Sequence, residues 1–163
     1  MTRIRVAALA LTRWDETGEA LLLVRKRGSL RFMLPGGKFE ADETDAACLA
    51  RELREELALA FDPRTAVRLG RFEAQAANEP GHIVEATVYR QVATPGLNPV
   101  CGAEIEEIRW LSLTGGTDEA AWPLAPLLTG QFLAPARRIP HTECLTRCLR
   151  PCTPGSRPST SSR

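Results

Sequence analysis

The segment from Gly37 to Leu59, GKFEADETDAACLARELREELAL, constrains the fold more than any other part of the sequence. Turn-forming residues come first, and Thr44 or Asp45 can then cap a helix by accepting a hydrogen bond from its first turn. Apolar residues follow at the spacing of a helix that packs one side against a sheet. The predicted apolar stripe consists of Ala46, Ala50, Leu53 and Leu57.

The same helix carries three carboxylates. Glu52, Glu55 and Glu56 are spaced so that they project from one side of a helix, roughly opposite the apolar stripe. Carboxylates crowded in this way repel one another unless a cation lies among them. Hard carboxylate oxygens suit magnesium or manganese, and divalent metals held in this way commonly serve phosphate chemistry. We therefore expect this side of the helix to face a cleft.

The segment resembles the Nudix signature, G-x5-E-x7-R-E-U-x-E-E-x-G-U, in which U is a bulky apolar residue. Eight of the nine specified positions match, and the exception is Ala58, which stands where the signature has glycine. That position follows the helix end, where a left-handed backbone is often needed, so the change concerns the local turn more than the carboxylates. The matching residues are Gly37, Glu43, Arg51, Glu52, Leu53, Glu55, Glu56 and Leu59.

The resemblance implies both a fold and a chemistry. The fold would be α/β, a Nudix-type α-β-α sandwich with a mixed sheet, over about residues 4–135. The activity would be Mg²⁺-dependent hydrolysis of a nucleoside di- or triphosphate or a related nucleoside-diphosphate derivative, with Mn²⁺ as a possible alternative metal. Water would attack one phosphorus while the metal neutralises charge on the phosphate oxygens.

The same resemblance implies metal ligands from several parts of the chain. Family members often add a late acidic residue from a loop, and we choose Glu104 for this role ahead of Glu106 and Glu107. The predicted ligands are the backbone carbonyl of Gly36 and the carboxylates of Glu52, Glu55, Glu56 and Glu104.

The catalytic residues implied by the resemblance are Arg51, Glu52 and Glu55. Arg51 would brace the glutamates, with Glu43 as its partner, and either Glu52 or Glu55 would take the proton from the attacking water. A surface helix with solvated ion pairs would also fit RELREEL, but that interpretation does not account for the fixed spacing back to Glu43.

Three cations flank the predicted glycine turn at residues 36–37. Arg25, Arg27 and Lys38 are predicted to bind the phosphates of the substrate. For Arg25 and Arg27, an equally good interpretation is that they are solvent-exposed charges at the end of a strand. Lys38 lies directly beside the box, which favours the functional interpretation.

Alternating and β-branched segments predict the remaining elements. Two hairpins are expected, the first from residues 4–12 and 19–26 and the second from residues 67–76 and 82–92. A short extended piece at residues 32–35, a strand at residues 105–111 and a helix at residues 124–133 complete the prediction.

Composition predicts one domain over residues 1–136 and a tail over residues 137–163. The tail holds six arginines and one glutamate among proline, serine and threonine residues, which predicts disorder. The net charge of +1 over the whole chain argues against binding of long nucleic acids. No apolar run approaches the roughly 20 residues of a membrane span, and no export signal is evident, so a cytoplasmic location is expected.

The leading functional hypothesis is therefore a Nudix pyrophosphohydrolase that acts on a small nucleotide, and the resemblance makes a homodimer a candidate assembly. The alternative is a non-catalytic Nudix domain that senses a nucleotide or binds a partner. Such domains usually lose glutamates of the box, whereas all of them are present here. Metal-dependent phosphate release from a panel of nucleotides would separate the two classes.

Overall fold

A mixed sheet forms the body of the structure, which is a computed structural model that describes residues 2–102, 104–113 and 124–129. The α-helix α1 (Asp45–Leu57), the short 3-10 helix η1 (Pro63–Thr65) and a helical turn at residues 126–129 accompany the sheet. The six strands are β1 (Thr2–Asp15), β2 (Gly18–Lys26), β3 (Gly36–Lys38), β4 (Val67–Gln75), β5 (His82–Val92) and β6 (Ile105–Ser112).

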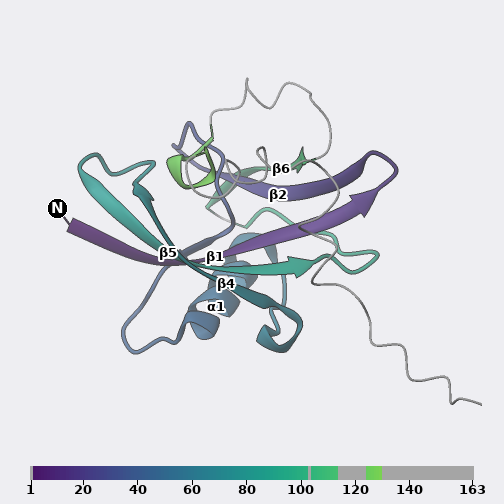
Figure 1. Cartoon of the computed structure of the whole chain (residues 1–163), viewed down its shortest axis with the longest axis horizontal. Helices are drawn as coiled ribbons and strands as arrows, with labels where there is room; N and C mark the ends of the chain where they lie inside the picture. The colour runs from purple at the N-terminus through teal and green to yellow at the C-terminus, as the bar shows by residue number, and fades with distance from the viewer. Residues whose placement is uncertain (1, 103, 114–123, 130–163) are drawn as a thin grey trace, which may run out of the picture.

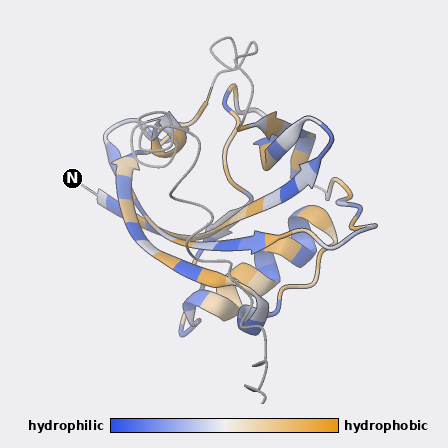
Figure 2. Cartoon of the chain, turned by 45° about the vertical axis from the view of Figure 1, so that its right-hand side comes forward, coloured by the Kyte–Doolittle hydropathy of each residue, from blue (hydrophilic) through white to orange (hydrophobic). Residues whose placement is uncertain are grey.

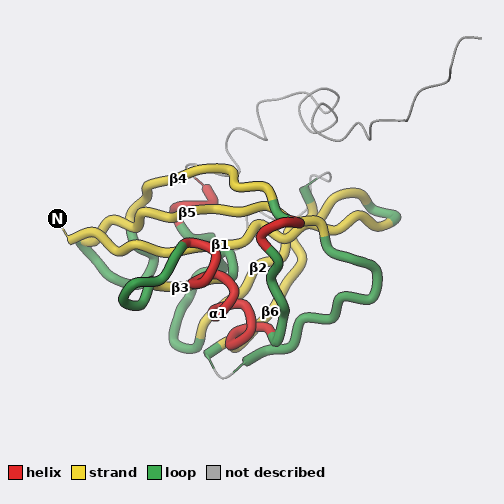
Figure 3. The backbone as a smooth tube through the Cα atoms, turned by 90° about the horizontal axis from the view of Figure 1, so that it is seen from below, coloured by secondary structure: helices red, strands yellow, loops and turns green. Residues whose placement is uncertain are grey.

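The strands lie in the order β4-β5-β1-β2-β6, and β3 pairs with the first half of β1 (Figures 1 and 3). The two predicted hairpins are confirmed, because β1 pairs with β2 and β4 with β5 in antiparallel register. The central pair of β1 and β5 is parallel and joins the two hairpins into one sheet. The α/β class with a mixed sheet, as predicted, is confirmed.

The central strands of the sheet are buried on both faces, and successive side chains of one strand therefore enter two different cores. Ala7, Leu9 and Leu11 of β1 belong to the core under α1, whereas Ala8 and Ala10 belong to the core on the other face. Figure 2 shows both hydrophobic stretches and alternating hydrophobic and hydrophilic residues along the strands. A strand buried on both faces reads as a continuous apolar run, which explains the ALLLV segment of β2.

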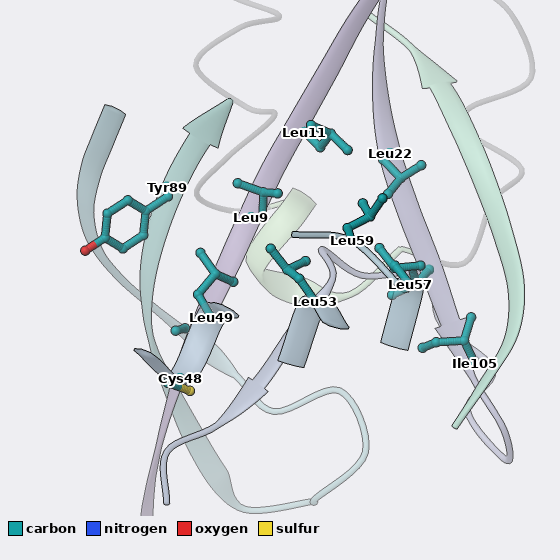
Figure 4. Packing of buried hydrophobic residues seen from close by; sticks show 12 residues of the cluster. Leu9, Leu11, Leu22, Cys48, Leu49, Leu53, Leu57, Leu59, Tyr89 and Ile105 are labelled. Carbon is teal, nitrogen blue, oxygen red and sulfur yellow. The ribbon is translucent and has the colours of Figure 1, made fainter. Parts of the chain in front are cut away.

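The helix begins as predicted, with the Thr44 side chain accepting a hydrogen bond from the Ala47 backbone N–H. Its buried side differs from the predicted stripe, because Ala46 and Ala50 are only partly buried. Leu53 and Leu57 of the predicted stripe do pack on the sheet, and Cys48 and Leu49 join them in place of the two alanines (Figure 4).

The opposite face of the sheet is covered in part by residues 124–129. Leu124 and Leu128 pack in the second core with Phe32, on the side of the sheet away from α1 (Figure 1). Of the predicted helix at residues 124–133, only residues 126–129 are both helical and described. The predicted tail at residues 137–163 lies outside the described residues, so the domain boundary stays a prediction. Within the described part of the chain, no helix has the length and apolarity needed to cross a membrane.

Candidate active site

A cleft of about 870 Å³ lies between the carboxylate side of α1, the end of β2 and the turn that joins β4 to β5. Its lining combines charged side chains, among them the glutamates of the helix, with apolar ones that include Ile4, Val6, Val84 and Leu127. The charged residues that line the cleft are Lys26, Lys38, Glu40, Arg51, Glu52, Glu55, Glu56, Glu79 and Glu104.

The double glycine between these walls is a strand rather than the predicted turn. Gly36 and Gly37 pair with Ala8 and Ala7 of β1, so the prediction of a turn at this point is wrong. The glycines are needed for close approach instead. A Cβ at Gly36 would lie 2.1 Å from the carbonyl oxygen of Ala7, and one at Gly37 would lie 2.2 Å from the carboxylate carbon of Glu52. The lack of a side chain at Gly37 therefore leaves the space that the Glu52 carboxylate occupies.

Arg51 holds the acidic residues of the box together, and its predicted pairing with Glu43 is confirmed. Its guanidinium donates two hydrogen bonds to Glu43, at 2.8 and 2.9 Å, and one to Glu52 at 2.9 Å. Glu55 lies further away, with Oε2 3.6 Å from Nη1 of Arg51. The hydrogen bonds from Arg51 lower the pKa of Glu43 to about 2, so this carboxylate is ionised throughout the physiological range.

Glu56 is the most deeply buried carboxylate of the three, with 2% of its side chain exposed. Its Oε2 accepts a hydrogen bond from the backbone N–H of Gly36 at 3.0 Å, and its Oε1 lies 2.6 Å from Nζ of Lys26. Burial raises the pKa of Glu56, and the ammonium of Lys26 opposes this increase. Glu56 is buried but still lines the cleft together with Glu52 and Glu55, in agreement with the expectation that this side of the helix faces a cleft.

The structure separates the three late acidic residues. Glu104 lines the cleft, with Oε2 3.7 Å from Nζ of Lys26, and 75% of its side chain is exposed. Glu106 and Glu107 instead form ion pairs with Arg25, at 2.7 and 2.9 Å. Of the three, Glu104 is thus the one positioned beside the glutamates of α1.

Of the three predicted phosphate-binding cations, one lines the cleft and two do not. Lys38 lines the cleft, and its Nζ lies 3.0 Å from Oε1 of Glu79 in the turn between β4 and β5. Arg25 and Arg27 are not among the residues that line the cleft. Arg25 is held by its glutamate partners on β6, and the backbone N–H of Arg27 donates to the Glu104 carbonyl. Their contact with a substrate stays a prediction, without support from their position.

The residue that the sequence prediction missed is Lys26. It follows Leu22 and Val24 on the face of β2 that points towards α1, because alternate residues of a strand share a face. The neighbouring Arg25 points the other way. The alternation along β2 puts Arg25 and Lys26 on opposite faces, but the apolar run before them does not show which face α1 covers, so the sequence alone could not select Lys26.

The chemistry of these side chains fits a divalent cation, although their present arrangement does not yet enclose one. Within the described residues, no three acidic, histidine or cysteine side chains converge closely enough to hold a metal ion. Oε1 of Glu56 is nevertheless a buried oxygen to which no described residue donates a well-aligned hydrogen bond. The carboxylates of Glu52 and Glu55 line the same cleft. Hard oxygen donors with one unsatisfied buried atom suit Mg²⁺ or Mn²⁺.

Comparison with known proteins supports the resemblance seen in the box. The model of the NUDIX domain matches residues 3–128. No curated protein sequence matches the chain. The structural matches below are all under 25% identical, so they bear on the fold alone.

The NUDIX domain of NrtR from Shewanella oneidensis, solved with ADP ribose, is 19% identical with a TM-score of 0.64; the match covers 84% of this chain and 88% of that one. A MutT NUDIX hydrolase from Burkholderia pseudomallei is 23% identical with a TM-score of 0.59, and the match covers 77% of this chain and 92% of that protein. A MutT/nudix family protein from Enterococcus faecalis is 18% identical with a TM-score of 0.58, covering 68% of this chain but only 44% of that protein. The signature, the shared fold and a family match over most of the chain establish that this protein belongs to the Nudix hydrolase family.

Proposed function

We propose that this protein is a metal-dependent pyrophosphohydrolase that cleaves a small nucleoside di- or triphosphate or a related nucleoside-diphosphate derivative. The observation that carries the proposal is the cleft, whose lining combines three glutamates of α1 and two lysines with apolar side chains. A charged diphosphate and a flat nucleoside require walls of these two kinds. The complex of the NrtR domain with ADP ribose supports a ligand of this class.

Magnesium, when bound, would neutralise charge on the phosphate oxygens and make the attacking water more acidic. Glu52, Glu55 and Glu56 would hold it together with the carbonyl of Gly36, and Glu104 would approach from the opposite wall. Arg51 fixes the position of the Glu52 carboxylate through its hydrogen bond at 2.9 Å. The Glu52 carboxylate is engaged by this hydrogen bond, whereas Glu55 lies further from Arg51 and is 56% exposed, so Glu55 is the better placed candidate to take the proton from water.

The substrate would lie along the cleft with its phosphates beside Lys38 and Lys26. Lys38 is 63% exposed and paired only across the cleft mouth to Glu79 among the described contacts, so its ammonium can turn towards an anion. The nucleoside would then reach the apolar wall. Asn78 is positioned there because its Oδ1 accepts a hydrogen bond from the buried Ser29 hydroxyl at 2.9 Å, which leaves its amide N–H groups for a ligand.

The test is release of phosphate or pyrophosphate from a panel of nucleotides, with Mg²⁺, with Mn²⁺ and with excess chelator. We expect turnover that requires a divalent metal and rises at alkaline pH, because the attacking water must lose its proton. Glu55→Gln should lower kcat by at least about 100-fold, the scale of losing one strong electrostatic contributor. Undiminished turnover in chelator would refute the proposed metal chemistry.

A matched control is Glu73→Gln on β4, since its side chain is 52% exposed, close to the 56% of Glu55, and does not line the cleft. This variant should keep the turnover of the unmodified protein. Nucleotide binding without turnover would instead support the non-catalytic alternative. A cytoplasmic location and a homodimer stay predictions from the sequence and family.

A further inference from the structure

Lysine is used at only two positions of the chain, and both are in the cleft. The 163 residues include 19 arginines but only Lys26 and Lys38 as lysines, and both side chains line the site described above. The side chains of lysine and arginine differ physically. The guanidinium of arginine is a rigid fork suited to fixed pairs, whereas the ammonium of lysine is a point charge on a flexible stem. A cation that must change partners is better served by lysine.

The contact of Lys26 with Glu56 is close but incompletely formed. Nζ lies 2.6 Å from Oε1, at ion-pair distance, yet Oε1 receives no well-aligned hydrogen bond from any described residue. By contrast, Oε2 of the same carboxylate accepts a hydrogen bond from the fixed backbone of Gly36. One oxygen is thus held by the fold, and the other is neutralised by a movable charge.

The side chain of Lys26 also has room to move away from Glu56. Its side chain is 24% exposed, against 2% for Glu56, and the nearest other carboxylate is Glu104 at 3.7 Å towards the cleft. An ammonium can therefore withdraw from Glu56 while remaining near a negative charge. The buried carboxylate cannot follow it, because the Gly36 N–H and the packing of α1 fix its position.

We propose that Lys26 is the resident counter-ion of Glu56 in the metal-free protein, and that binding of a divalent cation displaces it from this carboxylate into the cleft. The inference rests on the proposed metal site. Its physical basis is that two cations cannot share one buried oxygen without strong mutual repulsion. Lys26 would thus weaken metal binding and keep the buried carboxylate compensated when no metal is present.

The first experiment uses the unmodified protein. Acetic anhydride labels exposed amines, and chymotryptic peptides separate Lys26 from Lys38 because Leu30 and Phe32 lie between them. Labelling is compared in MgCl₂ and in NaCl of equal ionic strength, without nucleotide. We expect Lys26 to become severalfold more reactive with Mg²⁺, while Lys38 provides the internal reference. Equal labelling of Lys26 in the two salts would overturn the proposal.

The second experiment measures Mn²⁺ affinity by titration calorimetry, with melting of the metal-free proteins recorded in parallel. Lys26→Met should melt at lower temperature without metal and bind Mn²⁺ at least about tenfold more tightly, a typical size for coupling between two binding events. Lys26→Arg keeps a cation against Glu56 and should bind no more tightly than the unmodified protein. Lys38→Met removes the other cleft lysine and should leave Mn²⁺ affinity unchanged.

The outcomes distinguish this inference from the proposed function. If the unmodified protein does not bind Mn²⁺, the metal site itself and the displacement of Lys26 are both refuted. If it binds Mn²⁺ and Lys26→Met binds with the same or lower affinity, only the displacement is refuted. Should Lys26→Met fail to fold, the labelling experiment still decides the question on the unmodified chain.

Discussion

Arg51 and Glu43 are joined by two parallel hydrogen bonds, from Nε to Oε1 at 2.8 Å and from Nη2 to Oε2 at 2.9 Å. This forked geometry is among the strongest that an arginine and a carboxylate can adopt. It connects the middle of α1 to the loop that precedes the helix. Since Arg51 also donates to Glu52, the same guanidinium ties the loop to a residue of the cleft.

The pair should make stability depend on pH in the acid range. The pKa of Glu43 is about 2 in the folded chain against an ordinary value of 4.5, because Arg51 stabilises its ionised form. A lowered folded pKa contributes stability that is complete above pH 4.5 and disappears as the pH falls towards 2. Glu43→Gln should therefore be less stable than the unmodified protein at neutral pH. In acid, the difference in unfolding free energy between the two proteins should become smaller.

Urea unfolding of both proteins in chelator, at neutral pH and at about pH 3, measures this difference. Glu40→Gln is the control, because its Oε1 lies 3.9 Å from Nε of Arg51 and its side chain is 70% exposed. It should change stability little at either pH. A difference between the unmodified protein and Glu43→Gln that stays constant with pH would contradict the assignment.

Alanine should lower stability at Gly36 but turnover at Gly37. Gly36→Ala places a Cβ against the backbone oxygen of Ala7 at a residue with φ of 135°, so we expect a loss of at least about 2 kcal/mol in stability. Gly37→Ala meets first the side-chain carboxylate of Glu52 rather than backbone, and should fold. It should lower turnover by about tenfold to 100-fold, since it displaces that carboxylate. Unfolding curves and turnover together test the pair, and an active Gly37→Ala would show that the position of Glu52 is unimportant.

Two isosteric substitutions on α1 should differ in stability when metal is absent. Glu55→Gln alters a side chain that is 56% exposed and should leave the melting temperature unchanged. Glu56→Gln removes the charge beside Lys26 in a site where the carboxylate is 2% exposed, and should cost about 1–3 kcal/mol. Thermal unfolding in chelator measures both. Equal melting temperatures would mean that Lys26 contributes nothing to the metal-free fold.

Ala58→Gly should stabilise the protein. Ala58 ends α1 with a left-handed backbone, at φ 55° and ψ 29°. Its N–H donates a hydrogen bond to the Arg54 carbonyl, and the N–H of Leu59 donates one to the Leu53 carbonyl. The cap thus forms despite the missing glycine, at the expense of strain in an alanine. Relief of that strain, less the greater freedom of glycine in the unfolded chain, should give about 0.5–1 kcal/mol. Urea unfolding tests this, and a destabilised variant would contradict it.

The sequence alone determined what depends on neighbours along the chain. The helix over Asp45–Leu57 and its Thr44 cap follow from spacing within one short segment, and the resemblance of that segment to the Nudix signature implied the pairing of Arg51 with Glu43. The two hairpins follow similarly, since each joins strands separated by one turn. In such local elements the period of the sequence is also the period of the structure.

Only the tertiary structure decided which distant residues meet. Arg25 faces Glu106 and Glu107 because β6 pairs with β2 in one particular register, and Lys26 faces Glu56 because α1 packs on the other face. A shift of one position would exchange these two cations. Likewise, the double glycine reads locally as a turn, but its close approach to β1 makes it a strand. These features depend on packing between segments far apart in the chain, which no local pattern specifies.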